Sequence, residues 1–125
     1  MDAEWKQLHE SHAFTRLEVC DTAEGVHVQR LASKCMGRRQ GVWHAAGVLA
    51  DALLPMQTAE SYRQVFAPKV HGAWELHLAC FTCVVEACVL FSSVVGLLGG
   101  AGQSNYGAAN ACLDTLTLCQ RATGQ

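Results

Sequence analysis

The chain has 125 residues, of which half are hydrophobic and 16% are charged, and its formal net charge is −2. That length fits one domain or part of one, and the composition excludes an intrinsically disordered segment. The basic residues are scattered, with only Arg38 and Arg39 adjacent, so the charge pattern does not favour a nucleic-acid partner.

The first residues, MDAEWKQLHE, are polar and charged, unlike a secretory signal. The apolar stretch from Ala87 to Gly102 is interrupted by serines and glycines and is shorter than the ~20 residues that a membrane span needs. Seven cysteines, an odd number without a signal peptide, indicate a reducing compartment rather than a disulfide framework. We therefore expect a cytoplasmic protein without a membrane span.

One cysteine cluster leaves a second interpretation open. Cys80 and Cys83 are spaced as CxxC, and His71, His77 and Cys88 are near them in the sequence. A zinc module usually needs a second ligand pair at a defined spacing, and none follows here. We favour cysteines that act as small apolar core residues, and we predict no metal site.

The first half of the chain predicts short elements. Residues 1–13 form a weakly defined segment with some helical tendency, and Arg16–Cys20 (RLEVC) is a strand candidate. Apolar residues at helical spacing predict a helix over Glu24–Met36, with Gly37 after it. Its apolar face would consist of Val28, Leu31, Ala32 and Cys35. Gly41–Ala46 (GVWHAA) is typical of a buried strand.

The second half predicts longer elements. A loop with one short turn leads to Thr58, a candidate N-cap for a helix over 59–80 with a bend near Pro68, which lacks an N–H. The apolar run Val84–Phe91 predicts a strand covered on both faces. A loop over 96–102 and a helix over 106–121 follow.

Strands that alternate with helices predict a Rossmann-like, doubly wound α/β fold with a parallel sheet. In such folds ligands bind beyond the carboxyl ends of the strands. Two motifs lie at such ends, HAAG at 44–47 and FSS at 91–93. We therefore expect them to converge on one crevice.

The segment 91–114, FSSVVGLLGGAGQSNYGAANACLD, carries the chemistry. It would place the Ser93 hydroxyl and the Tyr106 phenol at the mouth of that crevice, with Asn110 one helical turn after Tyr106. Reduction of a ketone needs such donors, because negative charge grows on its oxygen as hydride reaches carbon. A cation beside the phenol would favour its ionised form.

Each of these residues alone is more often a packing or capping residue, and their joint spacing carries the hypothesis. The chain contains PKV-x-GA-x-x-LH from 68, LFSS from 90 and GQ-x-NY-x-AANA-x-LD from 102. This spacing resembles the ketoreductase domains of polyketide synthases and animal-type fatty acid synthases, within the short-chain dehydrogenase/reductase superfamily. Ordinary members have a Lys four residues after the Tyr, whereas this chain has Asn110 there and Lys69 upstream.

The resemblance implies the site residues. Tyr106 would donate the proton, Ser93 would orient the carbonyl, Lys69 would tune the Tyr, and Asn110 would support the Lys and a proton-relay water. It also implies NADPH as the cofactor, because protein side chains supply no hydride. The HAAG residues would approach its nicotinamide-side ribose, and the Asp of the Cys20-Asp21 pair would lie beside its adenine. These cofactor residues are Asp21, His44, Ala45, Ala46 and Gly47.

The implied reaction is NADPH-dependent reduction of a β-ketoacyl thioester to a β-hydroxyacyl thioester in polyketide or fatty acid biosynthesis. Its implied partners are an acyl carrier protein, which carries the substrate on phosphopantetheine, and other synthase domains. One stereochemical class of the family has Leu-Asp-Asp after HAAG, and this chain has Leu49-Ala50-Asp51. The other class has Trp eight residues before the Tyr, where this chain has Leu98, so the resemblance favours the first class.

We expect residues 14–125 to be a partial ketoreductase domain. No glycine-rich phosphate loop precedes the first expected strand. In the family order 3-2-1-4-5-6-7, the chain would supply strands 3, 4 and 5, without the N-terminal cofactor-binding βαβ unit, the C-terminal strands and the lid. The sheet would then have open edges and uncovered apolar surface, giving a marginally stable chain. The alternative function is therefore an inactive fragment with only a structural or interaction role.

Overall fold

The computed structural model describes residues 6–7, 10–11, 15–35, 40–80 and 85–124. Of the helical tendency expected in the first 13 residues, residues 6, 7 and 10 are helical, and most of the others lie outside the described residues. The first complete element is α2, Gly25–Cys35, which agrees with the helix expected there. Val28 of this helix is buried, whereas Cys35 is exposed.

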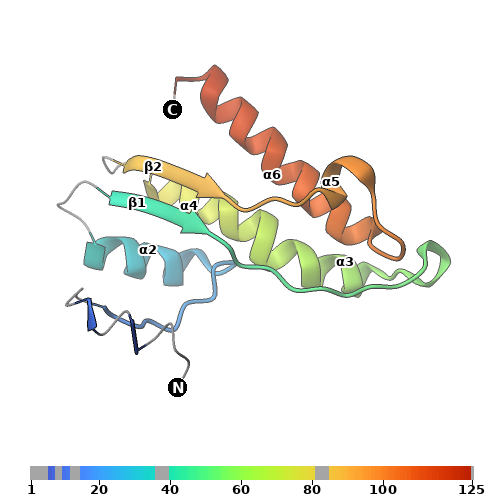
Figure 1. Ribbon diagram of the computed structural model, residues 1–125, viewed down its shortest axis with the longest axis horizontal. Coiled ribbons are helices and arrows are strands. Elements are labelled where there is room, and N and C mark those ends of the chain that lie inside the picture. The colour runs from blue at the N-terminus through green and yellow to red at the C-terminus, as the bar shows by residue number, and fades with distance from the viewer. Residues whose placement is uncertain (1–5, 8–9, 12–14, 36–39, 81–84, 125) are drawn as a thin grey trace.

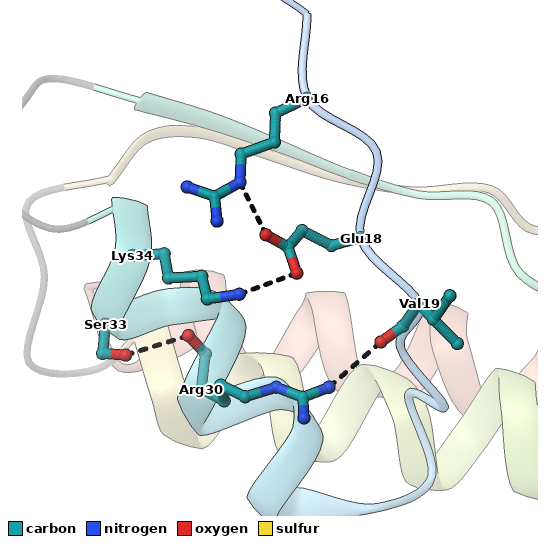
Figure 2. Close-up of polar contacts among 6 residues, drawn as sticks. All are labelled: Arg16, Glu18, Val19, Arg30, Ser33 and Lys34. Carbon is teal, nitrogen blue, oxygen red and sulfur yellow. Dashed lines mark hydrogen bonds and ion pairs between the residues drawn. The ribbon is translucent and has the colours of Figure 1, made fainter.

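The strand expected over Arg16–Cys20 is wrong, because residues 15–20 have no regular secondary structure. A strand exists only as a member of a hydrogen-bonded ladder, and the described part of the chain places no other strand beside this segment. A carbonyl of the segment is instead bound by a side chain: Arg30 Nη2 of α2 donates to Val19 O at 3.1 Å (Figure 2).

An ion-pair group joins the same segment to α2. The Glu18 carboxylate lies 2.6 Å from Arg16 Nε and 2.7 Å from Lys34 Nζ, so one anion bridges the segment and the last turn of the helix (Figure 2). The hydrogen bond from Lys34, with the positive charge of Arg16, lowers the pKa of Glu18. Exposed pairs of this kind add little stability, so they fix the path of the segment more than they stabilise the fold.

In the described part of the chain, the sheet consists of two parallel strands, β1 (Gln40–His44) and β2 (Val85–Leu90). The parallel pairing was expected, and β1 ends two residues earlier than predicted. Val42 pairs with Cys88 and His44 with Leu90, and the register shifts between Gln40 and Gly41. Beyond the last pair, Phe91 N donates to His44 O at 3.0 Å, so the two chains stay together past the strand ends.

The connection between the strands is one long interrupted helix. A 3₁₀ turn, η1 (Leu54–Met56), is the short turn expected in the loop. Thr58 caps α3 (Ala59–Phe66) as predicted, in a capping box with Ser61. The helix continues as a π-helical segment, η2 (Ala67–His71), and then as α4 (Gly72–Cys80). The irregularity expected at Pro68 is therefore a wide turn, since α-helical bonding cannot pass a residue without an N–H.

After β2, the chain forms α5 (Val95–Leu98) and α6 (Ser104–Ala122). A loop was expected where α5 forms one helical turn, and α6 begins two residues before Tyr106. Figures 1 and 2 show α2, α4 and α6 on the same side of the two strands. The fully buried apolar residues belong to this helical layer: Val28, Val65, Ala73, Ala109 and Leu113.

The face of the sheet away from the helices is uncovered. Trp43 pairs with Val89, and their exposed fractions are 62% and 37%. The expectation that β2 is covered on both faces is therefore wrong, because the described helices cover only one face. Among the helices described here, none is long and apolar enough to cross a membrane.

Candidate active site

The carboxyl ends of β1 and β2 converge on one side chain, Lys69. Its Nζ donates to Phe91 O at 2.8 Å, and only 4% of the residue is exposed. Lys69 belongs to η2, so the wide turn of the helix brings this cation beneath the strand ends. A buried ammonium needs polar partners, because desolvation of a charge is costly.

The second contact of this cation is the ring of Tyr106. Lys69 Nζ lies 5.3 Å from the ring centroid, within the range of a cation–π interaction. Tyr106 is the third residue of α6 and is half-buried. The structure thus brings together two residues that are far apart in the sequence and that spacing alone had suggested as partners.

Asn110 lies one turn along α6 and is fully buried. Its Nδ2 donates to Tyr106 O at 2.7 Å, and Ser92 Oγ donates to Asn110 O at 3.4 Å. Its Oδ1 is buried and has no hydrogen-bond partner among the described residues. Buried acceptors are normally satisfied by protein or ordered water, so this oxygen marks a place for a donor.

Ser93 follows β2 and begins the turn into α5. Its Oγ accepts from Val95 N at 3.3 Å, and its carbonyl accepts from Gly96 N at 2.9 Å. The residue is half-buried, so the hydroxyl is held near the strand end while its own proton remains available to a second acceptor.

Sequence reasoning missed Asn105, which holds the start of α6 in place. It is fully buried, and its Nδ2 donates to Ala50 O at 2.8 Å and to Ser61 O at 3.3 Å. Its Oδ1 accepts from Tyr106 N at 2.7 Å. Its place directly before Tyr106 in the GQ-x-NY motif was the available signal, although the motif assigned it no role. Asn105 fixes the position of Tyr106 relative to the loop after β1 and to α3.

The expected cofactor residues differ in exposure. Ala45 and Gly47 are exposed and Ala46 is half-buried, whereas His44 is only 3% exposed. The His44 ring faces the helix, with Nε2 3.2 Å from Lys69 O. Burial lowers the pKa of His44, and the charge of Lys69 adds to this, against hydrogen bonds that raise it. The imidazole is therefore neutral at physiological pH.

Asp21 is exposed, and its carboxylate accepts from Ala23 N at 3.0 Å. The next residue, Thr22, donates from Oγ1 to Pro68 O at 3.3 Å. This bond places Asp21 beside η2, on the side of the molecule where β1 ends. The residues expected to hold the two ends of a dinucleotide thus belong to neighbouring segments.

The cysteine cluster gives no support to a zinc site. Cys83 lies outside the described residues, and His77 Nδ1 lies 2.9 Å from Gln120 Nε2 of α6. In the described ranges, no group of three or more His, Cys, Asp and Glu side chains is arranged to hold a metal ion.

The model of the KR domain family matches residues 1–125. The chain belongs to the KR domain family. Related curated proteins are polyketide synthases, in which this chain matches a small part. The spectinabilin polyketide synthase system protein NorB of Streptomyces orinoci is 43% identical over 111 residues, 87% of this chain and 5% of NorB. The polyketide synthase GfsB of Streptomyces halstedii is 41% identical over 125 residues, 98% of this chain and 2% of GfsB.

Solved ketoreductases share the fold of this KR chain. The first ketoreductase of the tylosin PKS is 38% identical, with a TM-score of 0.88 over 95% of this chain and 26% of that structure. An N-terminal ketoreductase from the macrolactin assembly line is 31% identical, with a TM-score of 0.89 over 95% of this chain and 25% of that structure. The Rossmann-like fold class is therefore confirmed, and the chain spans about a quarter of these structures.

Proposed function

We propose that this KR chain supplies the catalytic side chains of an NADPH-dependent β-ketoacyl reductase in polyketide biosynthesis. The substrate is a β-ketoacyl thioester carried on the phosphopantetheine of an acyl carrier protein, and the product is the β-hydroxyacyl thioester. The observation that carries the proposal is the buried Lys69 ammonium, held between the end of β2 and the ring of Tyr106. Few purely structural roles require an ammonium to be buried beside a phenol.

Two hydroxyls act on the substrate carbonyl in this proposal. The Tyr106 hydroxyl donates a proton to the ketone oxygen as negative charge develops there, and Ser93 donates a hydrogen bond to the same oxygen. The acceptor bond from Val95 N at 3.3 Å supports this role for Ser93, because it leaves the hydroxyl proton for the substrate. Proton transfer by a positioned acid typically accelerates a reaction by about 10²–10⁴-fold.

Lys69 and Asn110 support the proton donor. The Lys69 ammonium stabilises the negative charge that remains on the phenol oxygen after proton transfer. The buried Asn110 Oδ1, which has no partner among the described residues, accepts a hydrogen bond from a water that carries the replacement proton.

The residues at the end of β1 fit a nicotinamide cofactor. NADPH, when bound, supplies the hydride. Ala45, Ala46 and Gly47 present little side chain at the strand end, which lets a ligand approach the backbone. A Cβ on Gly47 would lie 3.4 Å from Lys69 Cε, so this segment of small residues lies beside the catalytic cation. The exposed Asp21 would hold the adenine end, and His44 contributes its backbone while its ring is buried.

The partners proposed are the acyl carrier protein and other domains of a multidomain synthase. The support comes from the relatives, in which matching segments are small parts of polyketide synthases. That the chain belongs to the stereochemical class with Leu-Asp-Asp after HAAG stays a prediction. Asp51 of the Leu49-Ala50-Asp51 segment accepts from Gln103 Nε2 at 3.0 Å, beside the beginning of α6.

The test is Tyr106→Phe in the full-length protein that carries this chain. We expect NADPH oxidation with a β-ketoacyl thioester surrogate to fall by at least about 10²-fold, because the proton donor is lost. Tyr62→Phe is the matched control, since Tyr62 is also half-buried and its hydroxyl donates to Ser104 Oγ at 3.4 Å. Full activity of Tyr106→Phe would remove the proposed role of this residue.

Direct titration with NADPH separates this proposal from an inactive structural fragment. Saturable binding, weakened by substitution of Asp21 with Ala, supports the reductase. Its absence in the full-length protein supports a chain with only a structural or interaction role.

A further inference from the structure

Two consecutive carbonyls of the wide turn η2, Pro68 O and Lys69 O, accept hydrogen bonds from side chains outside the helix. Pro68 lacks an N–H and its ring disfavours an α-helical turn, and here Gly72 N is shared between Ala67 O, five residues back, and Lys69 O, three residues back. Single π turns of this kind often occur at functional sites. Here the turn contains Lys69, the cation of the proposed site.

Side chains from two other segments bind these carbonyls. Thr22 Oγ1 donates to Pro68 O at 3.3 Å, and His44 Nε2 lies 3.2 Å from Lys69 O. A carbonyl only accepts, so Nε2 of the neutral imidazole carries the proton. One donor comes from the loop before α2 and the other from the end of β1, so the turn is fixed from two directions.

The packing around these donors leaves no spare room. A Cβ on Gly72 would lie 2.5 Å from Thr22 Oγ1 and 3.2 Å from His44 Cε1. Both donors therefore lie directly against the helix backbone, and Gly72, which has no side chain, is the residue at the point of contact.

We propose that Thr22 and His44 are positioning residues for Lys69, an inference that rests on the proposed reductase function. Their hydrogen bonds hold the carbonyls of η2 and so set the direction in which the Lys69 side chain leaves the helix. That direction takes Nζ to Phe91 O and to the Tyr106 ring. Without these donors, the two carbonyls lose their side-chain partners, and the wide turn is less favoured over other backbone arrangements.

The test compares Thr22→Val, which keeps the shape but removes the hydroxyl, with Thr22→Ser, which keeps the hydroxyl. In the full-length protein we expect Thr22→Val to lower kcat about tenfold, the value of one hydrogen bond, with KM for NADPH and thioester within about twofold. The pH profile of kcat should also shift, since Lys69 acts on the proton donor. Thr22→Ser should restore both.

A second readout does not depend on activity. In a pulse of acetic anhydride, mapped by mass spectrometry and normalised to the exposed Lys34, Lys69 should react several-fold faster in Thr22→Val than in wild type or Thr22→Ser. If Thr22→Val does not fold, Thr22→Ala removes the same hydroxyl and takes its place in both assays.

The outcomes separate the two proposals. An inactive wild-type protein overturns the reductase function, while the labelling of Lys69 still decides the positioning role. Active wild type with normal kcat, pH profile and Lys69 labelling in Thr22→Val overturns the positioning role alone. Equal losses in Thr22→Val and Thr22→Ser also overturn it, because the hydroxyl would then not be the group that matters.

Discussion

Lys69 shows how single residues obtain their chemistry from backbone atoms. An ammonium loses several kcal/mol of hydration when it is buried, and a nearby carboxylate would repay this cost but neutralise its charge. Here a carbonyl oxygen and an aromatic ring are the contacts, at 2.8 Å and 5.3 Å from Nζ. In the proposed reaction, the positive charge is thereby kept for the phenol oxygen.

His44 gives a prediction about pH. Burial lowers its pKa in the folded chain below 6.5, whereas the unfolded chain keeps an ordinary value. Below about pH 6.5 the unfolded state then binds more protons than the folded state. The contribution of the neutral His44 to the free energy of unfolding is therefore complete above that pH and decreases as the pH falls. The loss from this residue is at most about 1.4 kcal/mol per pH unit.

The measurement is the urea midpoint of the chain between pH 5 and pH 8, at low protein concentration. We expect His44→Gln to be less stable than wild type at pH 8 but to lose less stability on acidification. Parallel curves for the two proteins would show that His44 does not carry the pH dependence.

Motif spacing predicted some site residues and not others. Lys69, Tyr106 and Asn110 stand in recognisable spacing, and the structure brings them together. Thr22 belongs to no recognised motif, and Asn105 belongs to the GQ-x-NY motif without an assigned role, because their partners are carbonyls of Pro68, Ala50 and Ser61. A carbonyl belongs to every residue, so the sequence does not reveal which ones will need a donor.

Among the elements, α5 and α6 meet through glycines. A Cβ on Gly96 would lie 3.2 Å from Asn110 Cβ and 3.3 Å from Ala111 N, and a Cβ on Gly107 would lie 3.2 Å from Val95 O. Backbone atoms on the opposing element cannot move aside as a flexible side chain does. The close approach keeps the segment after Ser93 against the face of α6 that carries Asn110.

Gly96→Ala tests this contact. Ala favours a helix over Gly by about 0.5–1 kcal/mol, whereas overpacking of a close contact costs about 1–3 kcal/mol. We expect net destabilisation, measured by thermal melting, together with a lower kcat because Asn110 is displaced. Thr115→Ala, at an exposed position of α6, should leave kcat unchanged. A Gly96→Ala protein as stable and active as wild type would contradict the importance of this contact.

Elements with local signals were predictable. The helix α2, the cap at Thr58 and the irregularity at Pro68 each depend on neighbouring residues, and the sequence contains those residues. The segment 15–20 has strand-like residues, yet a strand also needs a partner, and the described chain offers none. The exposure of β2 could not be predicted for the same reason, since other elements decide whether the faces of a strand are covered.

At the scale of the whole molecule, the described residues form a helical layer against one face of a two-stranded sheet (Figure 1). The opposite face presents Trp43, of which 62% is exposed. Exposed apolar side chains on an open sheet favour self-association. We therefore expect the 125-residue chain by itself to associate as its concentration rises.

Trp43→Thr should reduce this association without lowering the melting temperature, because Thr suits a strand and Trp43 contributes little to the buried core. Sedimentation velocity over a concentration series measures the effect. Trp74→Thr on α4 is the matched control, since Trp74 is 50% exposed but lies on the helical side, next to His77. A monomeric wild-type chain with a sharp cooperative melt would refute the prediction.

The register of the sheet also has a consequence in time. Val42 pairs with Cys88, so the first strand waits for the whole intervening helix before it gains a partner. At a synthesis rate of about 5–20 residues per second, the ribosome needs seconds to add the residues between β1 and its partner β2. Lys69, Phe91 and Tyr106 meet only after that pairing, so the site is assembled only once the chain has been synthesised beyond Tyr106.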